Sequence, residues 1–165
     1  MILKLSLDLP EEASFVQTTR HLSRTLLEDI HVIKSDIDDV ETIVAELCTN
    51  VIRHAKSKEK HFKVELQYFE PRVVIIVTDR GPGFNEQDIS PVGTERPDGN
   101  GGVRIGGFGL TLLEGLADKL DFSETDPHGT TVHAEKNLHY ETPGDANDAT
   151  ERDKGSGGTV TISKD

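Results

Sequence analysis

Apolar and polar residues alternate at the beginning of the chain, where leucines occupy positions 3, 5, 7 and 9. A period of two is typical of a strand that buries one face, so we expect a half-buried strand there. The same alternation recurs over residues 62–68 and 130–136, and residues 120–122 begin a similar segment. Residues 73–77 are β-branched without interruption, which predicts a strand buried on both faces.

Three other segments repeat their apolar residues every three or four positions, which is the period of a helix with one apolar face. The clearest of them covers residues 36–56. Pro10 is followed by two glutamates that favour a first helical turn, so it predicts a helix that begins there and continues to about Leu27. A third helix is expected over residues 110–117.

The predicted elements follow in the order strand, helix, helix, strand, strand, long loop, helix, strand, strand. Short turns between neighbouring strands imply antiparallel pairing. We therefore expect an α+β fold, a two-layer α/β sandwich with three helices on one face of a mixed, mostly antiparallel sheet. Residues 1–136 form one domain in this interpretation. Residues 137–165 are expected to be an acidic, glycine-rich, disordered tail, because positions 141–158 contain no large apolar side chain.

The chain of 165 residues has 30 acidic residues against 18 lysines and arginines, a formal net charge of −12. This balance argues against generic binding to nucleic acid or to an anionic membrane, since both need clustered basic residues. It serves solubility or recruits a basic partner. Cys48 is the single cysteine and lies in an apolar helical pattern, which predicts a buried, inert thiol and excludes an intramolecular disulfide. The chain has no apolar run of about 20 residues and no signal-peptide pattern, so we expect a cytoplasmic protein.

Candidate chemistry appears first on the long predicted helix. Glu46, Asn50 and His54 are spaced four residues apart, so they share one face at the edge of the apolar stripe. A carboxylate beside a carboxamide can serve as a general base and as a metal ligand. The alternative is an ordinary solvated helix face.

Two glycine-rich stretches complete the pattern. The buried strand ends in Asp79, which can accept a hydrogen bond from an exocyclic amine, and Gly81 and Gly83 allow a ligand close to the backbone. Residues 106–110 open the third helix with glycines, where bare N–H groups attract an anion. The alternatives are a plain turn and a flexible linker. Between them, residues 81–107 form a loop long enough to be functional.

Taken together and in this order, the three stretches resemble the GHKL superfamily of ATPases, which includes gyrase, the heat-shock chaperone, MutL and histidine kinases. The resemblance covers residues 1–136 and implies the Bergerat ATP-binding fold. Its N box and two glycine boxes are matched by Glu46 and Asn50, by Asp79, Gly81 and Gly83, and by Gly107, Gly109 and Leu110, and Gly129 and Thr130 resemble the pair that closes the adenine pocket.

The opening helix with Arg20 and the segment 45–55 resemble, more narrowly, the anti-sigma serine kinases of the RsbW and SpoIIAB type. The resemblance implies a Mg-ATP-dependent protein serine kinase that binds a sigma factor and phosphorylates an antagonist of the STAS fold. It also implies a homodimer formed through the sheet or the first helix. Three alternatives stay open: an ATP-gated binding module without transfer, a switch kinase of the RsbT type with a scaffold as partner, and a degenerate ATP site.

The resemblance also implies a role for each matched residue. Glu46 would be the general base and Asn50 the ligand of Mg²⁺. Asp79 would accept from the adenine amino group, and Thr130 would reach the base through water. The glycines would let base, ribose and phosphates approach the backbone. The lid would span about residues 84–106, and its run 100–106 is longer than in many relatives. His54 and Arg104 receive no assigned role.

Overall fold

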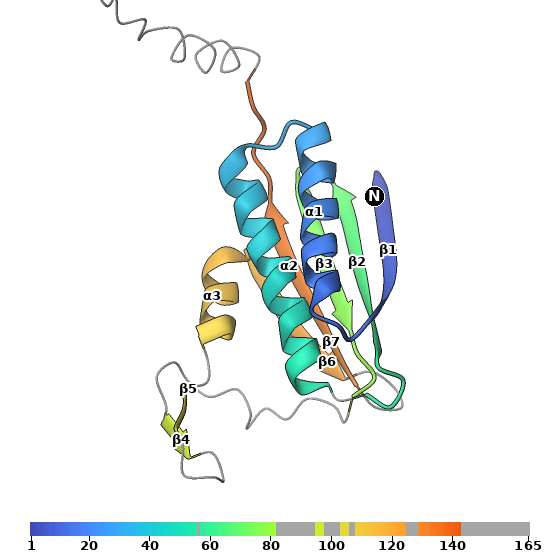
Figure 1. Ribbon diagram of the computed structural model, residues 1–165. Coiled ribbons are helices and arrows are strands. Elements are labelled where there is room, and N and C mark those ends of the chain that lie inside the picture. The colour runs from blue at the N-terminus through green and yellow to red at the C-terminus, as the bar shows by residue number, and fades with distance from the viewer. Residues whose placement is uncertain (56, 82–94, 98–102, 106–107, 125–128, 143–165) are drawn as a thin grey trace, which may run out of the picture.

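Five strands form one sheet in the order β1-β2-β3-β7-β6, and each pairing is antiparallel (Figure 1). The computed structural model describes residues 1–55, 57–81, 95–97, 103–105, 108–124 and 129–142. The strands of the sheet are β1 Leu3–Pro10, β2 His61–Phe69, β3 Arg72–Thr78, β6 Lys119–Glu124 and β7 Thr130–Asn137.

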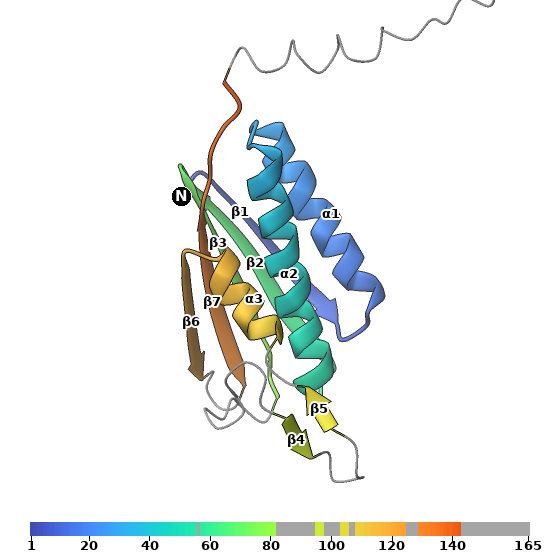
Figure 2. The same cartoon turned by 90° about the vertical axis from the view of Figure 1, so that its left-hand side faces the viewer.

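Three helices cover one face of this sheet (Figure 2). They are α1 Ser14–Asp29, α2 Lys34–His54 and α3 Phe108–Leu116. The core lies between the layers, because alternate residues of the central strand β3 face α2 and are almost fully buried, among them Val73, Ile75 and Val77. The predicted α+β sandwich is therefore confirmed. The sheet is antiparallel throughout the described residues, so the parallel component that we allowed is not seen there.

The start of the first helix was predicted wrongly. Pro10 ends β1, opposite His61, and α1 begins only at Ser14. The amide of Glu11 donates to the carbonyl of Lys60 at 2.8 Å, which continues the contact between β1 and the β2 side by one residue beyond Pro10. Proline is tolerated at this position because β1 is an edge strand and loses no hydrogen bond there.

The buried stripe of α1 also differs from the leucine pattern. Thr19, Ser23 and Leu27 are its buried residues, whereas Leu22 is 40% exposed. The two hydroxyls donate to carbonyls of their own helix, Thr19 to Phe15 at 2.8 Å and Ser23 to Arg20 at 2.7 Å. Small side chains with satisfied hydroxyls let two helices pack closely, and α1 packs against α2. Arg24 of α1 strengthens the contact by ion pairs to α2.

The chain after β7 packs onto the domain before it leaves the described residues. Leu138 is 4% exposed, and Tyr140 forms a bridge with Val32 in the loop between α1 and α2. Asp36 of α2 accepts hydrogen bonds from the backbone amide and the ring Nδ1 of His139, at 2.7 and 2.9 Å. Residues 137–142 therefore belong to the packed unit, and the rest of the expected tail lies outside the described residues.

Cys48 lies in the core with no exposed surface, as predicted. Burial raises the pKa of its thiol to about 12, because the thiolate would lose its hydration. None of the described helices combines the length and the apolar character needed to cross a membrane.

Candidate nucleotide site

Glu46 and Asn50 lie on one face of α2, partly buried, where the beginning of α3 meets that helix. Gly109, in the first turn of α3, makes the approach possible. A Cβ added to Gly109 would lie 2.8 Å from Oε2 of Glu46 and 3.9 Å from Oδ1 of Asn50. The structure therefore brings three of the predicted site residues to one place, although Gly109 lies 63 positions after Glu46 in the chain.

A second close approach lies at the other end of this face. A Cβ on Gly81 would lie 2.2 Å from the carbonyl oxygen of Ala55, which follows α2 directly. A side chain at this position would collide with backbone that has no room to move. Glycine is thus required at position 81, where the chain that follows β3 lies directly against the backbone at the end of α2. About 13 Å of helix separate Glu46 from Ala55.

Asp79 follows β3 and is 7% exposed. Its Oδ1 accepts a hydrogen bond from the amide of Gly81 at 2.7 Å, and its own amide donates to the carbonyl of Thr130 at 2.9 Å. Burial raises the pKa of the Asp79 carboxyl, and the negative charge of Glu11 adds to the rise. Hydrogen bonds from Gly81 and Thr130 oppose it by stabilising the ionised form. The result is a buried carboxylate held in a fixed orientation, which suits an acceptor for a ligand's N–H group.

Gly129 and Thr130 close the other side of Asp79. Gly129 has φ of +136°, which L residues rarely adopt, and a Cβ there would lie 2.2 Å from the carbonyl oxygen of Asp79. The two segments are thus held close together, and the Asp79 amide bonds to the Thr130 carbonyl.

Glu11, whose charge acts on Asp79, and its hydrogen-bond partner Ser57 were not predicted. The Ser57 hydroxyl donates to Oε1 of Glu11 at 2.5 Å, and Ser57 is 6% exposed. The sequence placed Glu11 in a helix, and nothing in its spacing linked it to a serine 46 positions away. Glu11 contributes through its charge, since it raises the pKa of Asp79.

Some of the predicted site residues lie outside the described residues, and for others the structure gives only their position in an element. Gly83, Gly107 and most of the expected lid lie outside the described residues. Leu110 lies in the first turn of α3. Within the lid region, β4 Glu95–Pro97 pairs with β5 Val103–Ile105, and Arg104 stands opposite Arg96 in that ladder. His54 lies exposed in the last turn of α2.

The donor set at α2 fits a divalent cation that prefers oxygen. Glu46 offers a carboxylate and Asn50 a carboxamide oxygen, and Mg²⁺ is usually held by one or two such groups together with substrate phosphates. Among the residues that the structure describes, no group of three or more His, Cys, Asp or Glu side chains could hold a metal alone.

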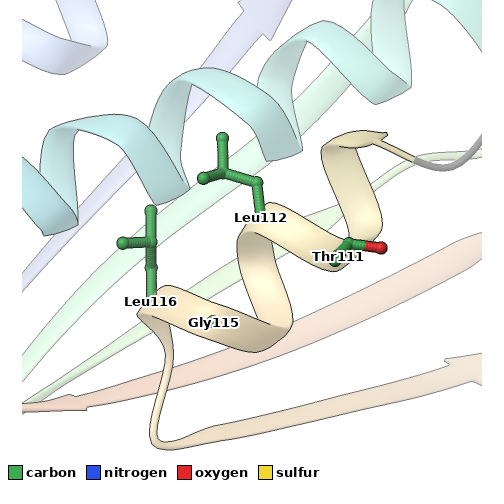
Figure 3. A pocket seen from close by; sticks show the side chains of 4 residues that line it. All are labelled: Thr111, Leu112, Gly115 and Leu116. Carbon is green, nitrogen blue, oxygen red and sulfur yellow. The ribbon is translucent and has the colours of Figure 1, made fainter. Parts of the chain in front are cut away.

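An open, apolar hollow of about 380 Å³ runs along α3 and is distinct from this site (Figure 3). Thr111, Leu112, Gly115 and Leu116 line it, and Leu112 is 42% exposed. Its described lining provides little to orient a nucleotide, because Thr111 is the one polar side chain among these four residues. The polar groups around Glu46 and Asp79 are better candidates for nucleotide contacts.

Comparison with known proteins agrees with this geometry. The family of the histidine kinase-like ATPase domain matches residues 9–136. A serine-protein kinase RsbW of Halalkalibacterium halodurans is 29% identical over 124 residues, which cover 73% of this chain and 75% of that protein. An anti-sigma F factor of Clostridium novyi is 34% identical over 107 residues, covering 62% of this chain and 72% of that protein.

Solved structures share the fold. A chain from the SiaB-SiaC complex of Pseudomonas aeruginosa superposes with a TM-score of 0.61 at 16% identity and covers 80% of this chain and 88% of its own. A protein of Mycobacterium tuberculosis with RsbU and RsbW domains gives 0.60 at 20% identity and covers 85% of this chain. This chain spans only 35% of that longer protein.

The fold, the paired oxygens on α2 and the family match define an ATP-binding domain, and the chain belongs to the histidine kinase-like ATPase domain family. Within that family it is of the RsbW and SpoIIAB type, the group of anti-sigma serine kinases. The resemblance seen in the sequence and the prediction of a protein serine kinase are thereby confirmed.

Proposed function

We propose that this chain transfers the γ-phosphoryl group of ATP to a serine of a STAS-fold antagonist, and that it also binds and inhibits a sigma factor. The contact of Gly109 with Glu46 carries the proposal. It sets the first turn of α3, where free amides favour a phosphate, against a carboxylate and a carboxamide oxygen. The relatives named serine-protein kinase RsbW and anti-sigma F factor support the choice of reaction and partners.

Glu46 acts as the general base in this proposal. It takes the proton of the serine hydroxyl while the serine oxygen bonds to the γ-phosphorus and the bond to the bridging oxygen of ADP breaks. Such a transfer leaves little covalent chemistry to the protein, which contributes by positioning and by neutralising charge. The partly buried place of Glu46 beside α3 suits that task.

The other site residues would bind different parts of the nucleotide. Asn50 would hold Mg²⁺, which neutralises charge on the phosphates when bound. Amides at Gly107, Gly109 and Leu110 would meet the phosphates. At the other end, Asp79 would accept from the adenine amino group, with Gly81, Gly83 and Thr130 around the base. The buried, oriented Asp79 carboxylate supports this assignment.

We further propose that the chain works in the cytoplasm, where ATP and sigma factors are found, and as a homodimer. The first three residues support a dimer through the sheet edge, since Met1, Ile2 and Leu3 are 68%, 63% and 41% exposed beside the free edge of β1. A long edge strand with exposed apolar residues is a template for pairing. Light scattering of the wild type and of Leu3→Glu would test this, with a monomeric wild type contradicting it.

The decisive experiment is transfer from γ-labelled Mg-ATP into a lysate of the source cell. Wild type, Glu46→Gln and the control Glu114→Gln are compared, since Glu114 is an exposed glutamate on α3. We expect phosphoserine on a small protein with wild type and control. The Glu46 variant should bind ATP normally, but it should transfer the γ-phosphoryl group on the order of 10²-fold to 10³-fold more slowly.

Other outcomes separate the alternatives. Normal transfer by Glu46→Gln would remove Glu46 from the role of base. ATP binding without any transfer would indicate an ATP-gated binding module. Transfer to a protein that is part of a large scaffold, with no sigma factor retained on the immobilised kinase, would indicate a switch kinase of the RsbT type.

A further inference from the structure

The C-terminal end of α3 is held by a lysine that no sequence motif singled out. Lys136 stands on β7 opposite Val73 of β3, so its side chain rises on the helix-facing side of the sheet. Its Nζ donates to the carbonyl of Leu116, the last residue of α3, at 3.0 Å. The same Nζ lies 2.7 Å from Oδ2 of Asp39 on α2. The ammonium thus joins β7, α2 and α3.

This ammonium is well suited to an anchor. The Lys136 side chain is only 16% exposed, and a charge removed from water in this way is stable only when it is paired and hydrogen-bonded. Asp39 supplies the opposite charge. The Leu116 carbonyl belongs to the last turn of a helix, where carbonyls lack an intrahelical partner and attract a cation.

Among the side chains of α3 that the structure describes, Leu113 is fully buried, while Leu112 and Gly115 are exposed. In Figure 3 the side chains of Leu112 and Leu116 point from α3 toward α2, and both line the open hollow. α3 has nine residues, and about 10 Å separate Leu116 from Gly109. A tilt of about 10° at the Leu116 end would therefore shift Gly109 by roughly 2 Å.

We propose that Lys136 is a positioning residue for the nucleotide phosphates: by tying the end of α3 to α2 and β7, it sets where Gly109 lies against Glu46. The inference rests on the proposed function, because it assumes that the first turn of α3 meets the phosphates. Lys136 touches neither Glu46 nor Gly109 and acts through the helix. Phosphate binding should depend on this lysine, whereas adenine binding at Asp79 should not.

The test compares wild type with Lys136→Met, Lys136→Arg and Asp39→Asn. Lys119→Met is the matched control, since Lys119 is a 60% exposed lysine whose ion pairs are to Asp121 and Glu135. Calorimetry measures binding of Mg-ATP, and competition with labelled ATP measures binding of adenosine. We expect Lys136→Met and Asp39→Asn to weaken the binding of Mg-ATP on the order of tenfold, because one charge-assisted hydrogen bond is then misplaced. The affinity for adenosine should stay unchanged. Lys136→Arg should restore most of the loss.

If Lys136 had a purely structural role, Lys136→Met would have a lower melting temperature and would bind ATP and adenosine more weakly to the same extent. That result would overturn the proposal. An unchanged ratio of ATP to adenosine affinity in a folded Lys136→Met would overturn it as well. If Lys136→Met does not fold, Asp39→Asn and Lys136→Arg decide. Hydrogen exchange without nucleotide gives a separate readout, with faster exchange of α3 amides expected in Lys136→Met and Asp39→Asn but not in Lys119→Met. Wild type that fails to bind ATP would instead refute the proposed function.

Discussion

The α-carbon of Gly109 faces the Glu46 carboxylate so closely that a single added methyl group would come within 2.8 Å of Oε2. Gly109→Ala should therefore leave the fold intact, because the atom it meets is the free end of a flexible side chain. The carboxylate must turn away, however, and we expect phosphoryl transfer to fall on the order of 10²-fold, since small displacements of a reacting group have effects of that size. Transfer assays and a thermal melt measure the two effects.

Gly115→Ala is the matched control in the same helix. A Cβ there meets nothing within 4 Å, so the change should stabilise the protein by about 0.5–1 kcal/mol without altering transfer. Equal transfer by both alanine variants would contradict the role given to the Gly109 contact.

Asn50→Ala should weaken ATP binding in a way that depends on metal. If the carboxamide oxygen holds Mg²⁺, the loss should reach about tenfold with Mg²⁺ present and disappear when the metal is chelated. Calorimetry in the two buffers measures this difference. Thr42→Ala is a suitable control on the same helix, because its hydroxyl donates to the Asp38 carbonyl and lies two turns away. Equal weakening with and without metal would count against the ligand assignment.

Asp79→Asn should change which base the site accepts. The carboxylate can only accept a hydrogen bond, whereas a carboxamide also donates. We therefore expect ATP to bind at least tenfold more weakly, while ITP, which carries a carbonyl in place of the amino group, loses much less. Competition binding of the two nucleotides measures the ratio. A ratio equal to that of the wild type would show that Asp79 does not read the amino group.

Glu65 should support the fold above pH 4.5 and cease to do so in acid. Lys4 and Lys63 flank its carboxylate at 2.8 and 2.5 Å, and these hydrogen bonds lower the pKa of Glu65 from 4.5 to about 2. A lowered pKa stabilises the folded state above the unfolded pKa, and that stability is lost as pH falls from about 4.5 to about 2.

Glu65→Gln should therefore be less stable at pH 7, by on the order of 1 kcal/mol because both lysines are partly in water. It should also lose less stability than wild type between pH 4.5 and 2. Urea unfolding across this range measures both effects, with the exposed Glu12→Gln as control. Parallel curves for wild type and Glu65→Gln would contradict the assignment.

Much of the fold was visible in the sequence where one period dominates. The leucines of β1 and the apolar face of α2 predicted their elements because burial of one face leaves a plain repeat. The first helix was misplaced because Pro10 satisfies a strand end as well as a helix start. Its buried stripe was missed because Thr19 and Ser23 are polar by composition and yet are buried, with hydroxyls bonded inside their own helix.

The candidate site was predictable where glycines and acids follow a motif, as at Asp79 and Gly81. Its supporting contacts were not, because they join residues that no spacing rule connects. Lys136 and Asp39 are 97 positions apart, and only the folded chain brings β7 under the junction of α2 and α3. Lys136 shares a face with Val132 and Ala134, but a lysine is expected to reach water from such a position, so its residue type concealed it.

The bridge between Tyr140 and the loop before α2 has a practical consequence for handling this protein. Asp36, which holds His139, and Ala55, which meets Gly81, stand at opposite ends of α2, about 28 Å apart. A fluorophore attached at Glu141 would thus be held on a packed part of the molecule, far from the proposed adenine end of the site. Together with a fluorescent ATP, this label would report nucleotide binding by energy transfer without blocking the site.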